Sequence, residues 1–134
     1  AAEAEWNELS VADKWSNLYC AYHIPYKLAS LRVMRGLDPN DTSHDQQTLT
    51  EEEIHTMAAV EHNRWNVEKL LMGFRRPKEN EDKYEHPEFK DKLKDNKKIF
   101  IHHDIRPFDT LDDIQQMDFE IVKYIPWILK MTEA

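Results

Sequence analysis

The stretch LTEEEI at residues 49–54 carries the clearest helix start signal in this sequence. The Thr50 hydroxyl can accept a hydrogen bond from the amide of Glu53, and the Glu53 carboxylate can reach back to the amide of Thr50. This reciprocal arrangement is a capping box, and Leu49 is spaced to pack on Ile54 across the same turn. A helix is therefore predicted to begin at residue 51.

This helix is predicted to run to about residue 72, to end near Gly73, and to have two different faces. At about 100° per residue, one face gathers aliphatic and aromatic side chains, and we predict that this face packs against the core. On a second face, a tryptophan lies among acids, a histidine and a lysine, and this composition is unusual for a surface that contacts only solvent. The first face consists of Met57, Val60, Val67, Leu70, Leu71 and Phe74, and the second of Ala58, Glu61, His62, Trp65, Glu68, Lys69 and Met72.

Two interpretations of Trp65 follow from this second face. In one, Trp65 packs under the preceding helices and the charged residues ring its edge. In the other, Trp65 is a platform on which a flat polar ligand stacks, and Glu61, His62 and Lys69 supply hydrogen bonds. Arg64 falls within the apolar face, so it is either a buried partner of an acid or an arm that reaches into a site.

Residues 1–49 are predicted to form an N-terminal helical extension followed by a polar loop. Ser10 can cap a helix whose apolar residues recur at spacings of three and four. Pro25 ends that helix and suits the first turn of a second one, which Gly36 ends. Residues 37–48 are polar and are predicted to be a loop.

Residues 50–134 are predicted to complete one compact, mainly α-helical unit. The β-like run IFI at residues 99–101 can pair with FRR at residues 74–76, and we predict a short antiparallel β-ribbon there. The charge-dense residues 77–98 are predicted to form a solvated loop. A last helix is predicted to begin near residue 110 or 112, with Pro126 kinking or restarting it.

The composition of the 134 residues excludes several classes of protein. Eighteen basic residues against 26 acidic ones give a net charge of -8, which argues against nucleic acid as the main partner. Two glycines do not make a phosphate-binding loop, and the apolar runs are too short for a membrane span or a signal peptide. The single Cys20 fits a reducing, cytoplasmic compartment. Because the chain begins without Met, we expect a fragment or a processed form.

The sequence contains none of the common catalytic or metal-binding motifs. Glu52-x-x-His55 is a single element, whereas a carboxylate-bridged di-iron bundle needs two of them and further glutamates. Cys20 fits a small core residue better than a nucleophile. We therefore predict no catalytic residues, no metal and no cofactor; an enzyme or metal protein with an unrecognised site is the remaining alternative.

Four segments of the C-terminal part occur in a specific order. They are MAAVEHNRWNVEKLLMGF at residues 57–74, HHDIRPFDTL at residues 102–111, Asp118, and IPW at residues 125–127. The first contains His62-x-x-Trp65 on the predicted helix and ends in a glycine and an aromatic residue. With these segments, residues from about 50 to 131 resemble the RyR domain, the repeat named for ryanodine receptors.

The resemblance implies a helical, non-enzymatic, cytosolic module of bacterial type, which stands alone or is attached to regulators of ion transport. It also implies a site for an adenine-type nucleotide, with Trp65 near the base and His62 beside it. Since one repeat is present, a homodimer would supply the second half. The positive groups expected to meet phosphates are Arg64, Lys69, Arg75 and Arg106.

Two functions follow as hypotheses. In the first, the domain senses a nucleotide or a related metabolite on the Trp65 face and regulates an attached transport or signalling protein. In the second, it is a protein–protein or intersubunit clamp without a small ligand, and Trp6, Trp65 and Trp127 anchor the interface.

Overall fold

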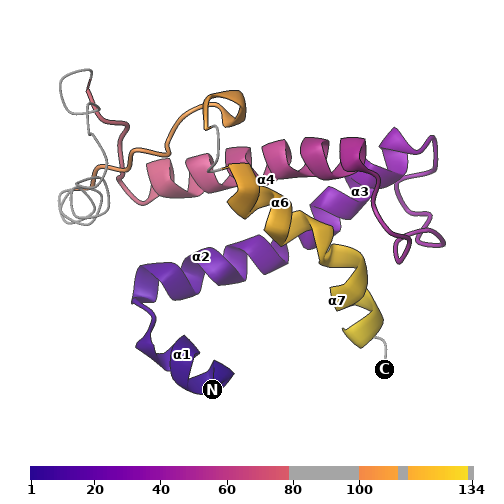
Figure 1. Cartoon of the computed structure of the whole chain (residues 1–134), viewed down its shortest axis with the longest axis horizontal. Coiled ribbons are helices and arrows are strands. Elements are labelled where there is room, and N and C mark those ends of the chain that lie inside the picture. Colours follow the sequence, from indigo (N-terminus) through magenta and orange to yellow (C-terminus); the bar gives the residue numbers. More distant parts are fainter. Residues whose placement is uncertain (79–99, 112–114, 133–134) are drawn as a thin grey trace.

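The computed structural model describes residues 1–78, 100–111 and 115–132, and these are mainly helical (Figure 1). The elements are α1 (Ala2–Glu8), α2 (Val11–Tyr22), α3 (Ile24–Met34), α4 (Glu51–Leu71), the 3-10 helix η1 (Phe108–Thr110), α6 (Gln115–Lys123) and α7 (Ile125–Thr132). The expected mainly α-helical fold class is confirmed.

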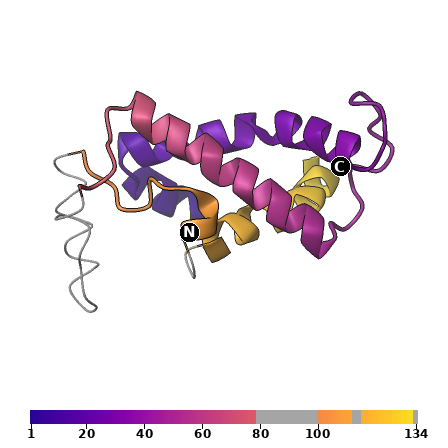
Figure 2. The same cartoon turned by 90° about the horizontal axis from the view of Figure 1, so that it is seen from above.

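Helix α4 is the long central element, and its predicted ends are confirmed. The Thr50 hydroxyl accepts from the Glu53 amide, and the Glu53 carboxylate accepts from the Thr50 amide at 2.9 Å. Gly73 follows the helix with a φ of 93°, which a residue without a Cβ adopts without strain. Figure 2 shows α2 and α3 on one side of α4, and α6 with the 101–111 segment on the other.

The N-terminal helices also follow their sequence signals. The Ser10 hydroxyl accepts from the amide of Asp13 at the start of α2, and Pro25 lies in the first turn of α3. Gly36 has a φ of 73° just beyond α3. The loop after it is attached to α3 by Arg32, whose guanidinium donates to both carboxylate oxygens of Asp45 at 2.9 and 2.5 Å.

Among the described residues, an apolar core joins the predicted N-terminal extension to the C-terminal part. Its buried members come from α3, the approach to α4, α4 itself, the η1 region, α6 and α7. They are Leu28, Leu31, Leu49, Met57, Ala58, Phe108, Leu111, Val122 and Ile125. This core occupies the N-terminal half of α4, so the second half of that helix is held by other contacts.

The predicted antiparallel ribbon is wrong for the described residues, which contain one isolated parallel bridge between Arg75 and Ile101. The Arg75 amide donates to the Phe100 carbonyl at 2.9 Å, and the His102 amide donates to the Arg75 carbonyl at 3.1 Å. Ile99 and the predicted loop at 79–98 lie outside the described residues.

The predicted last helix is divided into α6 and α7, as expected from Pro126, which is the second residue of α7. Lys123 ends α6 and Ile125 begins α7, so the proline restarts the helix after a one-residue break. The exact beginning predicted near residue 112 lies outside the described residues.

Candidate functional site

Along the second half of α4, the face that was predicted to be buried is exposed, and the charged face is buried. Val67, Leu70 and Leu71 of the supposed core face are 55%, 54% and 83% exposed. Glu61 and Lys69 of the second face are 1% and 6% exposed. The assignment of the aliphatic face as the core side is therefore wrong beyond Val60, and the charged face is the internal one.

The physical reason is a set of ion pairs between α4 and α3 and along α4, which we call the buried ion-pair network. The Lys27 ammonium of α3 lies 2.5 Å from Glu61 Oε2. The Arg64 guanidinium donates to Glu61 at 2.6 and 2.9 Å and to Glu68 at 2.9 Å. Lys69 Nζ completes the network 3.6 Å from Glu68 Oε2. Burial of so many charges is tolerated because each has a partner of opposite sign.

Side chains of α2 and α3 complete the hydrogen bonding of this network. The Ser16 hydroxyl donates to Glu68 at 2.7 Å, and Lys27 Nζ donates to His23 Nδ1 at 3.0 Å. Burial raises the pKa of the Cys20 thiol to about 11, and the negative charge of Glu61 adds to the effect. Cys20 is therefore a neutral thiol at pH 7.

The network contains one more positive charge than negative charges. Burial raises the pKa of Glu61, but hydrogen bonds from Arg64 and Lys27 outweigh it, so this carboxylate titrates below its usual range. Two carboxylates therefore face three cations, Lys27, Arg64 and Lys69. Arg64 is the buried partner of acids, which was one of the two alternatives left open for it.

On the opposite side of α4, His62 joins three segments. Its Nδ1 lies 3.3 Å from Asp118 Oδ2 of α6, and its Nε2 lies 2.8 Å from the carbonyl oxygen of Arg106. Carboxylate and carbonyl oxygens only accept, so these two neighbours favour the imidazolium form of the His62 ring. Burial lowers the pKa of His62, but the hydrogen bond and the charge of Asp118 outweigh it and hold the pKa above its ordinary value.

Trp65 is half-buried and lies beside His62, with the two rings stacked at a centroid distance of 5.6 Å. His102 meets the indole edge-on at 4.7 Å, and Lys69 Nζ lies 5.8 Å from the indole centroid. The aromatic contacts of Trp65 therefore run along α4 and to the segment after the parallel bridge. Two of these neighbours, His62 and Lys69, are side chains that the sequence predicted to bind a ligand stacked on Trp65.

The two remaining predicted site residues lie apart from the buried ion-pair network. The Arg106 guanidinium binds His103 through its carbonyl at 3.0 Å and its Nε2 at 2.6 Å, while the Arg106 carbonyl receives His62. Arg75 is exposed at the parallel bridge, where its guanidinium donates to the Arg76 carbonyl. The structure thus groups Glu61, Arg64 and Lys69 together, groups His62 and Trp65 with Arg106, and places Arg75 at the bridge.

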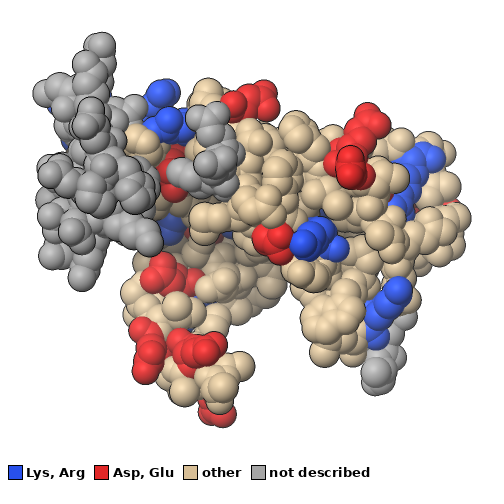
Figure 3. Space-filling model, viewed as in Figure 1, with Lys and Arg blue, Asp and Glu red and all other residues tan. Residues whose placement is uncertain are grey.

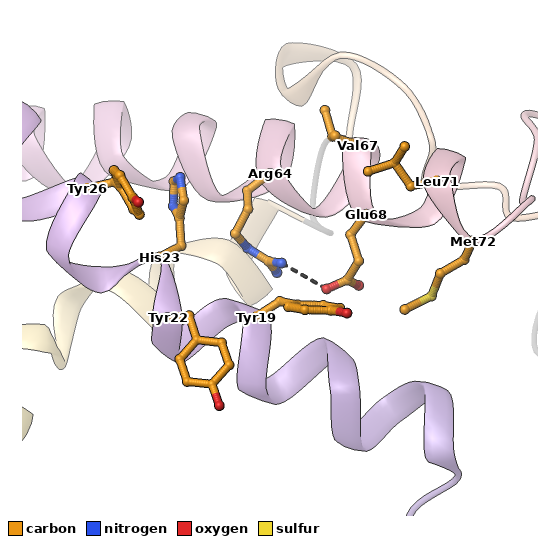
Figure 4. A pocket seen from close by; sticks show the side chains of 9 residues that line it. All are labelled: Tyr19, Tyr22, His23, Tyr26, Arg64, Val67, Glu68, Leu71 and Met72. Carbon is orange, nitrogen blue, oxygen red and sulfur yellow. Dashed lines mark hydrogen bonds and ion pairs between the residues drawn. The ribbon is translucent and has the colours of Figure 1, made fainter.

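A cavity of about 530 Å³ opens between α2, α3 and α4, and we call it the tyrosine groove. Figure 4 shows the Tyr19 ring directly beside the Arg64–Glu68 ion pair, whereas the Tyr22 ring points away from that pair and Tyr26 lies beyond His23. The Tyr22 and Tyr26 side chains are 63% and 68% exposed, so their rings are accessible to a ligand. The groove is lined by Tyr19, Tyr22, His23, Tyr26, Arg64, Val67, Glu68, Leu71 and Met72.

The sequence analysis missed most of the tyrosine groove, although a signal for it exists. Tyr19, Tyr22 and Tyr26 recur at spacings of three and four, which continues one helical face across the break at His23. The partner of Glu61, Lys27, gave no comparable signal because it belongs to another helix. A search for aromatic residues at helical spacing would have found the groove but not the charges at its base.

Comparison with known proteins adds no relative: no family model, no curated protein and no solved structure matches the chain. Within the described residues, none of the helices combines the length and the apolar character that crossing a membrane requires.

The buried ion-pair network predicts a strong dependence of stability on Glu61. Glu61→Ala leaves Lys27 and Arg64 buried without their carboxylate, and we expect the free energy of unfolding to fall by about 3–5 kcal/mol. Urea denaturation followed by circular dichroism measures this loss. The control is Glu120→Ala, which removes the exposed pair with Lys123 and should leave stability at the wild-type value. Equal losses of stability in both variants would show that the buried ion-pair network stabilises the fold no more than an exposed ion pair does.

The His62 contacts predict a pH dependence with a defined sign. Because the folded-state pKa lies above the ordinary value of 6.5, the stabilisation is complete below that pH and is lost as the pH rises through the folded-state pKa. At pH 6 we expect His62→Gln to be less stable than wild type by about 1–3 kcal/mol, and this gap should narrow towards pH 9.

The control for this measurement is Asp118→Asn, which removes the negative charge beside His62. The difference in stability between this variant and wild type should also narrow between pH 6 and pH 9. Urea denaturation of the three proteins at each pH supplies the comparison, and the titration of other histidines cancels in the difference. A gap between wild type and His62→Gln that stays constant from pH 6 to pH 9 would contradict the imidazolium.

Proposed function

We propose that the chain is a non-enzymatic binding module that holds a small aromatic molecule in the tyrosine groove. The observation that carries the proposal is the groove itself, a cavity of about 530 Å³ with phenol walls and a polar base. Small-molecule sites are typically concave, mostly apolar and about 300–1,000 Å³ in volume, with a few placed polar groups. The tyrosine groove combines these properties.

The ligand-sensing hypothesis is therefore kept, and its site moves from the Trp65 face to the other side of α4. His62 and Lys69 are buried and bonded to Asp118 and Glu68, so a ligand would have to displace these partners to reach them. Arg64 is the one predicted site residue that lines the tyrosine groove. An adenine-type nucleotide or a related metabolite, expected from the RyR resemblance, offers a flat base that can stack on phenol rings.

Ligand binding in the tyrosine groove can also serve the regulatory role that the RyR resemblance implies. A ligand held between α2, α3 and α4 contacts three helices, so its binding stabilises their mutual packing. An attached transport or signalling protein would sense that change as a stiffer domain. The chain would thus act as a regulatory module and not as an enzyme.

Tyr22→Ala tests the tyrosine groove. Tyr22 is 63% exposed and contributes no core packing, so its removal should weaken ligand binding by roughly 2- to 10-fold, as expected for loss of one aromatic contact. Thermal-shift titrations with AMP, adenosine and NAD measure the binding, and a ligand at 100 times its Kd stabilises the fold by about 2.7 kcal/mol. The matched control is Tyr124→Ala, which removes an exposed tyrosine outside the groove.

Two outcomes of this titration would contradict the groove as the site. In one, no ligand raises the melting temperature of the wild-type protein. In the other, Tyr22→Ala and Tyr124→Ala bind equally well while Trp65→Ala, still folded, loses binding. The second outcome would return the site to the Trp65 face.

A second candidate function, an intersubunit clamp between two copies of the chain, is favoured by the exposed apolar side chains. Uncharged side chains cover most of the described surface in the face drawn in Figure 3. Exposed apolar side chains that gather on one face mark protein contacts. Those at the predicted anchors and along α4 are Trp6, Trp127, Val67, Leu70 and Leu71. Sedimentation velocity separates the two functions, because a clamp predicts concentration-dependent dimers that Trp127→Ala weakens without any ligand.

A further inference from the structure

We infer that the tyrosine groove selects aromatic molecules that carry a negative charge. This inference rests on the proposed function and narrows its ligand class. Its basis is the position of the buried ion-pair network, which forms the base of the groove and holds one positive charge in excess.

The excess charge is enclosed by the protein. The side chains of Lys27 and Glu61 are each 1% exposed, and that of Arg64 is 10% exposed. Water and salt screen such charges weakly, so an unbalanced one acts over a distance of several ångströms. Among the described residues, the hydrogen-bonded partners of the network supply no third carboxylate. The positive potential is therefore felt at an opening that residues of the network line.

That opening is the tyrosine groove. Arg64 and Glu68 of the network line it directly, and His23, which also lines it, accepts a hydrogen bond from Lys27. Glu68 is the one carboxylate of the lining, and Arg64, Ser16 and Lys69 surround it with donors. Arg64 and Glu68 of the described lining balance each other, so the excess positive charge comes from Lys27 and Lys69, which belong to the network without lining the groove.

The neutral side chains of the groove also favour a negatively charged ligand. Burial lowers the pKa of His23, and the neighbouring charge of Lys27 lowers it further, so His23 is neutral at pH 7. Lys27 can only donate, so His23 Nδ1 accepts and the ring proton sits on Nε2. His23 Nε2 and the hydroxyl of Tyr19, whose ring lies beside the Arg64–Glu68 pair in Figure 4, are donors that can meet the oxygens of a carboxylate or a phosphate.

The local charge is opposite in sign to that of the whole chain, which has a net charge of -8. A negatively charged ligand is repelled by most of the surface and is favoured at a positive opening. This contrast makes the groove a selective site rather than one part of a generally basic surface. Both an aromatic carboxylate and an aromatic phosphate ester have the required chemistry.

The test compares ligands that differ in charge and share an aromatic ring. Isothermal titration calorimetry of the full chain uses indole-3-acetate against indole-3-acetamide for the carboxylate, and AMP against adenosine for the phosphate. The measured quantity is the charge preference, the Kd of the neutral ligand divided by that of the anion. We expect a preference of about 5-fold or more in at least one pair, and the pair that shows it identifies the anionic group.

Two variants change the charge of the network without removing a wall of the groove. Glu68→Gln raises the excess by one and should increase the charge preference by about 5-fold, whereas Lys69→Gln removes the excess and should bring the preference towards one. The preference is a ratio measured on one protein, so a moderate loss of stability in a variant does not alter it. Circular dichroism confirms that each variant is folded at the temperature of the titration.

The outcomes separate this inference from the proposed function. If the neutral and anionic ligands bind wild type equally, the groove is a binding site and the charge selection is wrong. If the preference exists but neither variant changes it, the network is not its source and the inference is again overturned. If no ligand of either pair binds, both the inference and the proposed function fail.

Discussion

The salt bridge between Lys27 and Glu61 fixes how α4 is rotated, and the rest of the structure depends on that rotation. Two charges that are each 1% exposed are tolerated only when they face one another, because a buried charge without a partner costs several kcal/mol. Once Glu61 faces α3, the geometry of the helix turns Arg64 and Glu68 towards α2. The same rotation turns His62 towards α6 and leaves Leu71 in solvent.

The rotation creates two different surfaces on α4. On one side, the His62 imidazolium ties the helix to Asp118 and to the Arg106 carbonyl, and Trp65 fills the space beside it. On the other side, polar side chains pack between α2 and α4, and the tyrosines of α2 and α3 are left around an opening. A structural feature that stabilises the fold thus also sets the shape and the charge of the candidate site.

The helix boundaries could be predicted because their signals are local. Thr50 meets Glu53 within one turn, and Pro25 and the glycines act through their own backbone. The buried face of α4 could not be predicted, because an amphipathic helix is expected to bury its apolar side chains. The partner that reverses this expectation, Lys27, lies on another helix. The parallel direction of the bridge between Arg75 and Ile101 could not be predicted either, because two short β-like runs do not define the direction in which they pair.

The burial of the charged face of α4 is tested most directly by shortening its aliphatic side chains. The measurement is the free energy of unfolding of the double variant Leu70→Ala, Leu71→Ala, determined in urea at low micromolar protein concentration. Since these side chains are 54% and 83% exposed, we expect a change within about 0.5 kcal/mol of wild type. If this face were the core, each truncation would cost about 2–5 kcal/mol. A loss of that size would contradict the rotation of α4 and the groove that depends on it.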